Sequence, residues 1–337
     1  MIGARHVHRA LVLVLAGLMI FGNAPSAFAY LKFGFDVNGQ QVTLKWNVTP
    51  VRYFVNNQDV GGVTAADFQS AVAQAFATWQ SVPTASITYQ FGGFTSSIPG
   101  DDDGVSTLGF LNEPALDRVL ASTSFLVDNT TGALLESDIF FNSAFTWSVA
   151  PNGEPAKWDV ETIATHEIGH FSGLGHSAIG ETQLMNGTRR VLSTGAVMFP
   201  IALGPGDISG RTLDPDDIAG ISDIYPDDNF NVRTGSISGQ VMKNGRGVFG
   251  AHVVAFDIGN GDQIANFTLT PDGRFSIAGL RPGPHVVRIE PLDDVDTDSF
   301  FDPSEPVDLN FHARFFDRLV VVPRGGDSGT VQISVSP

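Results

Sequence analysis

The chain has 337 residues, of which 42% are hydrophobic, so it is long enough to build two folded domains with cores of their own. Its formal net charge of −17 argues against nucleic acid as a partner, because a phosphate backbone would be repelled. The sequence contains no cysteine, which excludes disulfide bonds as a source of stability.

Residues 1–29 have the pattern of a secretory signal peptide. Arg5 and Arg9 give it a basic start, an apolar run follows, and the A-F-A sequence at 27–29 provides a small-x-small cleavage site. The apolar run is short for a membrane span, and no stop-transfer segment follows it. We therefore expect a mature chain that starts at Tyr30, is secreted and has no membrane span. A membrane anchor is the alternative.

The next residues predict strands on either side of one helix. Residues 42–56 are typical of a strand interrupted at Pro50, and residues 86–91 alternate like a second strand. Between them, an amphipathic helix is predicted from Thr64, its N-cap, to Gln80. Its apolar face comprises Phe68, Val72, Ala75, Phe76 and Trp79.

An acidic G-D-D-D-G turn at 100–104 precedes two further predicted strands, 122–127 and 137–142. Carboxylate oxygens are ligands that Ca²⁺ prefers, and the family resemblance described below implies a calcium loop in this part of the chain. A solvated surface turn is the alternative.

The strongest signal is H-E-I-G-H-F-S-G-L-G-H, which runs from His166 to His176. On a helix capped by Asp159, His166 and His170 project from one face and can hold one metal ion. Gly173 can adopt the positive φ that turns the chain back, so that His176 becomes a third ligand.

Three protein ligands and an open fourth position are typical of catalytic zinc. Glu167 is placed to take a proton from a zinc-activated water and pass it on, as general base and acid. A chance match on an ordinary amphipathic helix is the alternative. No other histidine lies between residues 9 and 165, so we expect a single zinc ion.

These residues resemble the metzincin zinc metallopeptidases, and Ser177 after the third histidine resembles their matrixin branch. That family places a methionine turn beneath the metal. The best match is Met198 in G-A-V-M-F-P, which makes residues 178–194 an inserted loop. Met185 lies nearer the third histidine and is the alternative.

The resemblance implies an α+β catalytic domain over residues 30–226, with a twisted sheet and long helices. It implies a zinc-dependent endopeptidase acting on protein or peptide substrates. It also implies that Phe199, Pro200 and Ile201 line the pocket for the residue after the cut. Many matrixins are held latent by a propeptide cysteine, and that device is impossible in a chain without cysteine.

The pattern of residues 211–225 predicts the last helix of this domain. Asp214 is expected to be its cap and Pro215 its first position. Asp216 and Asp217 either solvate the start of the helix, which we favour, or meet the mature amino terminus. A polar linker is expected at 227–233.

Residues 234–337 change to short alternating strands separated by glycine turns, which is typical of an all-β sandwich. The segment resembles the transthyretin-like regulatory domain of carboxypeptidases. We expect a non-catalytic module that stabilises the protein or binds a surface or matrix partner. His252 and His285 lack ligand spacing and are expected to be ordinary strand residues.

One acidic segment of this module matches a twelve-residue calcium loop at positions 1, 3, 5, 9 and 12. Position 6 is Ser299 rather than glycine, and no helices flank the segment, so an acidic surface loop is the alternative. The candidate calcium ligands are Asp294, Asp296, Asp298, Asp302 and Glu305.

The sequence therefore favours a secreted zinc endopeptidase with Glu167 as its catalytic residue. The alternatives are a secreted binding or adhesion protein that uses the protease-like domain as a scaffold, and another secreted zinc hydrolase.

Overall fold

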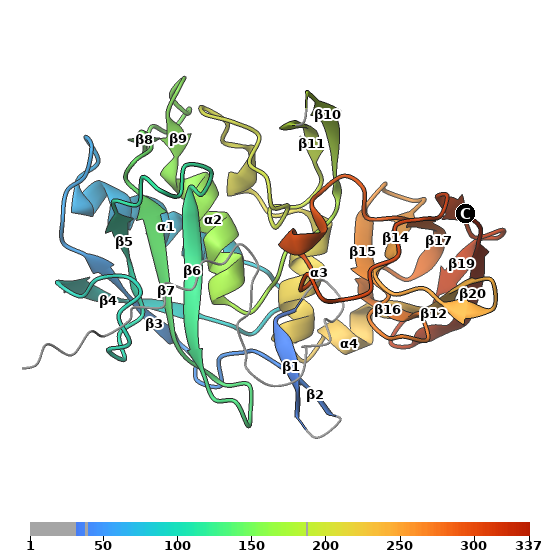
Figure 1. Cartoon of the computed structure of the whole chain (residues 1–337). Helices are drawn as coiled ribbons and strands as arrows, with labels where there is room; N and C mark the ends of the chain where they lie inside the picture. The colour runs from blue at the N-terminus through green and yellow to red at the C-terminus, as the bar shows by residue number, and fades with distance from the viewer. Residues whose placement is uncertain (1–31, 38–39, 187) are drawn as a thin grey trace, which may run out of the picture.

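The structure of the chain is a computed structural model that describes residues 32–37, 40–186 and 188–337 (Figure 1). The expected signal peptide, residues 1–29, and Tyr30 lie outside these ranges. In Figure 1 a sheet with two long helices occupies one side of the molecule, and a strand-rich part occupies the other. No helix in the described ranges is both long and apolar enough to cross a membrane.

A five-stranded sheet frames the N-terminal part. Its strand order is β4-β3-β5-β7-β6, and neighbours run parallel except β6, which is antiparallel to β7 and forms an edge of this sheet. The strands are β3 (Val51–Asn56), β4 (Tyr89–Thr95), β5 (Thr107–Leu111), β6 (Ala121–Val127) and β7 (Leu134–Asn142).

The strands predicted at 122–127 and 137–142 are confirmed as β6 and β7. The segment 42–56 is not one strand, because β2 (Gln40–Thr43) pairs with β1 (Gly34–Val37), whereas β3 begins directly after Pro50. The strand predicted from residue 86 begins at Tyr89, because β4 takes its register from β3.

Two helices pack together against this sheet. Helix α1 (Ala65–Gln80) begins after Thr64, whose hydroxyl accepts a hydrogen bond from the Asp67 amide, as predicted. Helix α2 (Val160–Phe171) begins after Asp159, which accepts from the Thr162 amide. A two-stranded pair, β8 (Trp147–Ser148) with β9 (Trp158–Asp159), leads into α2.

Trp79 joins the two helices. It is fully buried, and its indole Nε1 donates a 2.7 Å hydrogen bond to the Thr165 carbonyl oxygen in α2. Phe68, from the same face of α1, packs edge-on against Phe141 of β7. The apolar face that the sequence predicts for α1 therefore fixes α2 relative to the sheet.

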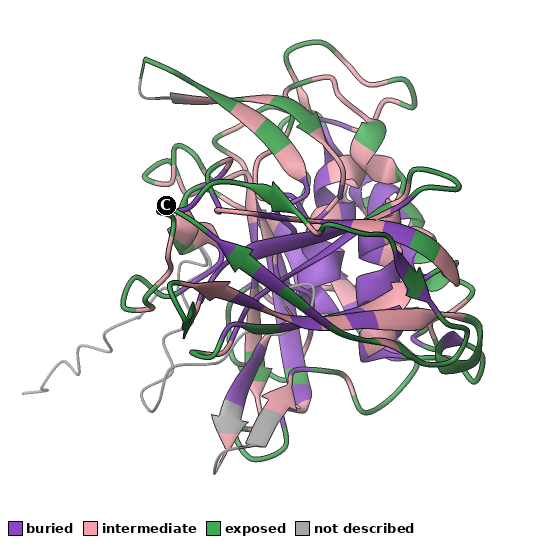
Figure 2. Ribbon diagram, turned by 90° about the vertical axis from the view of Figure 1, so that its right-hand side faces the viewer, coloured by how far each residue is buried: buried purple, intermediate pink, exposed green. Residues whose placement is uncertain are grey.

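The expected insertion at 178–194 is a β-hairpin of β10 (Gly180–Met185) and β11 (Thr188–Thr194). It projects from the body, and most of its described residues are exposed or half-buried (Figure 2). The last predicted helix has the expected cap and first residue, whereas residues 211–213 lie outside it. Helix α3 (Pro215–Ile224) starts at Pro215 after an extended Asp214, and a separate turn, η1 (Ser209–Arg211), precedes it.

The segment expected as a polar linker contains a short helix, α4 (Phe230–Arg233), whose Phe230 is buried. Two sheets follow. One contains β13 (Arg246–Gly247), β12 (Gly235–Lys243), β16 (Arg274–Leu280) and β20 (Asp327–Val335). The other contains β15 (Gln263–Phe267), β14 (His252–Asp257), β17 (Gly283–Glu290), β18 (Arg314–Phe315) and β19 (Val320–Val322).

Both sheets contribute side chains to one apolar core, including Ile237 and Ile277 from the first sheet and Val253 and Ile289 from the second. This core continues into the N-terminal part of the chain, so the two parts do not have separate cores. A long segment between β17 and β18 carries a helical turn, η2 (Thr297–Ser299). In Figure 1 this segment returns to the centre of the molecule beside α3, below the hairpin β10–β11.

Replacing Trp79 by Phe tests the joint between α1 and α2. The change removes a buried donor and leaves the Thr165 carbonyl with only its bond inside the helix, so we expect the free energy of unfolding to fall by about 2 kcal/mol. Urea denaturation followed by circular dichroism measures this change. A variant as stable as the parent would show that the indole hydrogen bond does not hold α2.

Candidate metal centre

Helix α2 brings the first two histidines of the motif together. His166 and His170 lie about one turn apart, and their Nε2 atoms are 3.1 Å from each other. His170 is buried, and the ring of Phe33 packs against it with a centroid separation of 5.5 Å.

Gly173 ends this arrangement with a turn, as predicted. Its φ is +97°, and a side chain here would collide with the carbonyl oxygen of Leu44. The turn returns His176, whose Nε2 lies 3.2 Å from Nε2 of His170. Nowhere else in the described residues do three or more side chains of metal-ligand type gather in this way.

Each ring is oriented through its other nitrogen. In all three, Nδ1 lies 2.8 Å from a backbone carbonyl oxygen; the pairs are His166 with Val197, His170 with Leu174, and His176 with Ser299. A carbonyl oxygen can only accept, so Nδ1 carries the hydrogen and each neutral ring presents a lone pair at Nε2.

Electrostatics favours the same protonation state. Burial lowers the pKa of His166, lowers that of His170 well below its usual value, and lowers that of His176 to about 3. The three rings are therefore neutral near pH 7, which is the form that binds a metal ion.

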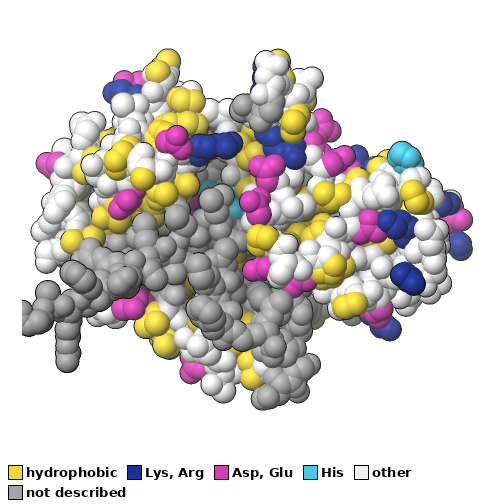
Figure 3. All heavy atoms as spheres, viewed as in Figure 1, with side chains coloured by type: hydrophobic (Ala, Val, Ile, Leu, Met, Phe, Trp, Pro, Cys, Tyr) yellow, Lys and Arg dark blue, Asp and Glu magenta, His cyan; other side chains and the backbone are white. Residues whose placement is uncertain are grey.

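The spacing of the nitrogens fits a bound ion. Converging lone pairs repel one another unless a cation lies between them. Two ligands of a tetrahedral zinc ion, with bonds of about 2.0–2.1 Å, lie about 3.3 Å apart, close to the separations seen here. In Figure 3 histidine side chains are visible in a recess near the middle of the molecule.

Glu167 lies between the two helical histidines in sequence and is only 5% exposed. Its Oε2 accepts a 2.7 Å hydrogen bond from the Thr123 hydroxyl on β6. Burial raises the pKa of Glu167 to about 7, and the hydrogen bond from Thr123 partly opposes this shift. Sequence reasoning missed Thr123, because its partner is 44 residues away and nothing in β6 distinguishes it from the serines on either side.

The structure places Met198, rather than Met185, beside the histidine helix. Met198 is buried, and a side chain at Gly169 would collide with its sulfur, so the sulfur lies against α2 next to His170. Met185 is 47% exposed on the hairpin.

The expectation that Asp216 and Asp217 solvate the start of α3 is wrong, because both are buried. The Asp217 carboxylate accepts hydrogen bonds from the amides of Val197 and Met198, at 2.8 and 3.1 Å. It thereby holds the methionine turn and the carbonyl that orients His166. Burial raises the pKa of Asp217 to about 7, and the amide of Val197 opposes the shift.

Asp216 links three segments. Its carboxylate accepts a hydrogen bond from the Ser177 hydroxyl and another from the Ala265 amide on β15. Burial raises the pKa of Asp216 to about 6. The residue after the third histidine is thus tied to the C-terminal sheets.

The segment after Met198 contacts the C-terminal part of the chain as well. Phe199 is 3% exposed and belongs to an apolar cluster that includes Phe267, Phe300 and Phe301. Ile201 packs at its margin, and Pro200 is half-buried. The expected pocket wall is therefore partly filled by residues from beyond position 260.

The predicted calcium ligands in the C-terminal segment have other partners. Asp294 accepts a hydrogen bond from the Thr182 amide, and Asp296 pairs with Arg189. Asp302 accepts from the amide and hydroxyl of Ser304. These acids do not gather as a metal-ligand group in the described residues, because the loop is shaped by the hairpin instead.

The acidic turn at 100–104 is held through its backbone. The amides of Gly100 and Gly104 donate to the buried carboxylates of Asp138 and Glu136. The two strand histidines also have local contacts, His252 with Glu290 and His285 with the Gly283 carbonyl.

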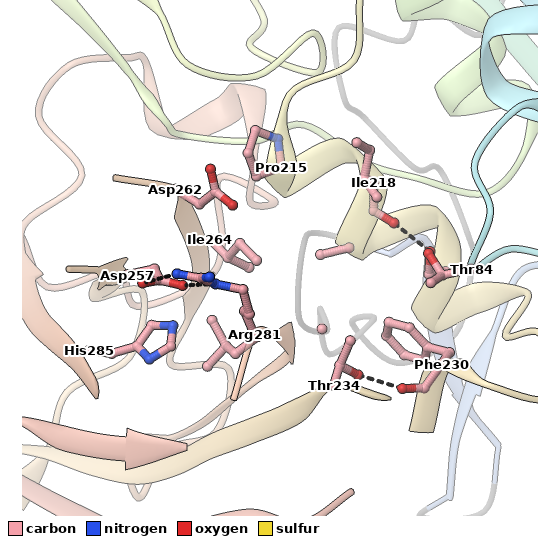
Figure 4. A pocket seen from close by; sticks show the side chains of 14 residues that line it. Thr84, Pro215, Ile218, Phe230, Thr234, Asp257, Asp262, Ile264, Arg281 and His285 are labelled. Carbon is pink, nitrogen blue, oxygen red and sulfur yellow. Dashed lines mark hydrogen bonds and ion pairs between the residues drawn. The ribbon is translucent and has the colours of Figure 1, made fainter. Parts of the chain in front are cut away.

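A cavity of about 220 Å³ lies between α3, α4 and the C-terminal sheets, away from the three histidines of the motif (Figure 4). Arg281 and Asp257 form an ion pair on one side of it, and Phe230 and Ile218 lie on the other. None of the motif histidines lines this cavity.

Replacing Asp217 by Ala tests the support beneath the metal centre. The change leaves the amides of Val197 and Met198 without a hydrogen-bond acceptor, so we expect a loss of about 3 kcal/mol in the free energy of unfolding. Asp228, an exposed acid after α3, gives the matched control Asp228→Ala. Equal thermal melting of the two variants would contradict the role assigned to Asp217.

Metal content tests the histidine cluster directly. We expect the purified chain to contain one zinc ion, and His170→Ala to lose it because the central ligand is gone. His312→Ala, a change at an exposed histidine, is the control and should keep the ion. Elemental analysis after dialysis gives the answer, and zinc retained by His170→Ala would refute the assignment.

Comparison with known proteins finds relatives that match about half of this chain or slightly more. Karilysin of Tannerella forsythia is 25% identical over 195 residues, which are 54% of this chain and 33% of that protein. Metalloendoproteinases 1-MMP and 2-MMP of Arabidopsis thaliana are each 28% identical, over 60% and 55% of this chain and 50% and 44% of their own lengths. The chain thus spans at most half of these relatives. The family model described as Matrixin matches residues 45–226, more than half of the chain, and the chain belongs to the matrixin family.

Proposed function

We propose that this protein is a secreted zinc-dependent endopeptidase. The observation that carries the proposal is the convergence of three neutral imidazoles whose Nε2 atoms lie 3.1 and 3.2 Å apart. Two of the relatives are named metalloendoproteinases, which supports the same activity. The substrate is a protein or peptide.

In this proposal His166, His170 and His176 hold the zinc ion through Nε2. When bound, zinc lowers the pKa of water and polarises a peptide carbonyl. Glu167 takes the proton from the attacking water and then delivers it to the departing amine. Burial raises the pKa of Glu167, which favours uptake of the proton by its carboxylate. Thr123 holds the carboxylate in place through its hydroxyl.

The sheet offers a way to bind an extended substrate. Strand β6 is an edge of its sheet and carries Thr123, the residue in contact with Glu167. An extended peptide that pairs with this edge would run past the catalytic carboxylate. We further propose that Pro200 and Ile201 line an apolar pocket for the residue after the cut.

We also propose the domain division expected from the sequence. Residues 1–29 are the signal peptide, 30–226 the catalytic domain, 227–233 the connection, and 234–337 a β-sandwich similar to transthyretin-like domains. Two separate sheets that both contribute side chains to the apolar core support the sandwich in the last assignment. A surface or matrix partner remains the proposed ligand of this module.

A binding protein with an inactive protease scaffold is less well supported. Such a scaffold has no need of a complete ligand set or of a buried carboxylate held by Thr123. Both features are present here.

Glu167→Gln tests the mechanism. The amide keeps the size of the side chain but cannot accept a proton, so we expect zinc content to be unchanged and the cleavage rate of casein to fall at least about 10²-fold. Glu181→Gln, at an exposed position of β10, is the matched control. A chelator should abolish the activity of the parent.

Two outcomes would overturn the proposal. One is a zinc-loaded parent that cleaves neither casein, gelatin nor a peptide library. The other is a Glu167→Gln variant that retains full activity.

A further inference from the structure

The third histidine is oriented by a part of the chain that lies far from the motif. The acceptors for His166 and His170 are Val197 and Leu174, within the region matched by the matrixin model. The acceptor for His176 is the carbonyl of Ser299, which is 123 residues downstream. One of the three rings therefore depends on the C-terminal part of the chain.

The residues around Ser299 form a defined turn. Ser299 closes η2 with a 3.0 Å hydrogen bond from its amide to the Asp296 carbonyl, and the Phe300 amide donates to Thr297 over the same distance. Phe300 is buried and packs edge-on against the ring of His176, with centroids 5.9 Å apart. The turn thus contacts His176 through both a carbonyl and an aromatic ring.

The hairpin β10–β11 holds the start of this loop. Arg189 donates from Nη1 to the Asp293 carbonyl at 2.8 Å and from Nη2 to the Val295 carbonyl at 3.1 Å. Thr182 donates its amide to the Asp294 carboxylate and its hydroxyl to the Asp294 carbonyl. We call these bonds of Thr182 and Arg189 to residues 293–296 the hairpin–loop contact.

The carbonyl bonds matter more than the ion pair in this contact. The Asp296 side chain that faces Arg189 is 70% exposed, and ion pairs of exposed groups contribute little to stability. Arg189 itself is only 17% exposed. Its guanidinium therefore binds backbone oxygens from a position partly shielded from water, where charged hydrogen bonds are stronger.

We propose that the C-terminal segment 291–305 is part of the metal centre. Held by Thr182 and Arg189, it positions His176 through the Ser299 carbonyl and so raises the affinity for zinc. Groups that orient a ligand through its second ring nitrogen commonly change metal affinity 10–100-fold. Arg189 and Thr182 are positioning residues that act through Ser299. The inference rests on the zinc site of the proposed function.

The test compares two arginines of one strand in the full-length protein. Arg190 follows Arg189 on β11, points to the opposite face, is exposed, and makes no ion pair among the described residues. Arg189→Ala should weaken zinc binding about tenfold or more in competition with a chromogenic chelator. Arg190→Ala removes the same charge and should bind zinc like the parent.

A spectroscopic measurement separates positioning from general destabilisation. With Co²⁺ in place of zinc, the visible absorption bands report ligand geometry, so Arg189→Ala should shift them and Arg190→Ala should not. Thr182→Val is the second variant. It keeps the side-chain shape and the amide bond but loses the hydroxyl, which donates to the Asp294 carbonyl and accepts from Arg189 Nη1. We expect weaker zinc binding and a shift of the cobalt bands smaller than that of Arg189→Ala. Melting of the metal-free proteins monitors folding.

The outcomes separate the two proposals. Equal zinc affinity and equal cobalt spectra for Arg189→Ala and Arg190→Ala overturn the positioning role. If Arg189→Ala also melts lower without metal, Thr182→Val decides, and an unchanged spectrum in that variant overturns the role. A parent chain that binds no zinc refutes the proposed function, whereas zinc binding without peptidase activity refutes the enzyme and leaves the positioning role intact.

Discussion

Three ring N–H groups that donate to backbone carbonyls are the constraint on which the site depends. A nitrogen that donates a hydrogen cannot bind a metal, so each of these bonds leaves Nε2 as the nitrogen that can bind the ion. The acceptors come from the end of α2, the methionine turn and the C-terminal loop. Three segments that are separate in the sequence thus each orient one ring.

Each of these carbonyls is held by a different device. Leu174 is placed by the turn at Gly173, where only glycine fits against Leu44. Val197 is placed by the buried carboxylate of Asp217, and Ser299 is reached through the bonds that the hairpin makes to its loop. The last two use buried or partly buried hydrogen bonds, which contribute more than the exposed ion pairs of the acidic surface.

The sequence predicts the features whose partners lie close in the chain. The three histidines, the turn at Gly173 and the caps of α1 and α2 depend on neighbours within about one or two helical turns, so spacing alone identifies them. The predicted cap Asp214 and first residue Pro215 of α3 are confirmed for the same reason. The start of β4 was wrong by a few residues, because pairing with β3 sets it.

Long-range partners account for the other differences. Thr123, Asp217 and Ser299 acquire their roles from residues 44, 19 to 20 and 123 positions away, which no local pattern reports. The acidic run from Asp294 has the composition of a calcium loop, but Arg189 of the hairpin determines its shape.

The bond between His176 and Ser299 also has a consequence for biosynthesis. A ribosome makes the chain from its amino terminus, so the third imidazole must wait for most of the remaining polypeptide before it gains its acceptor, and maturation of the site is a late event in the life of a nascent molecule.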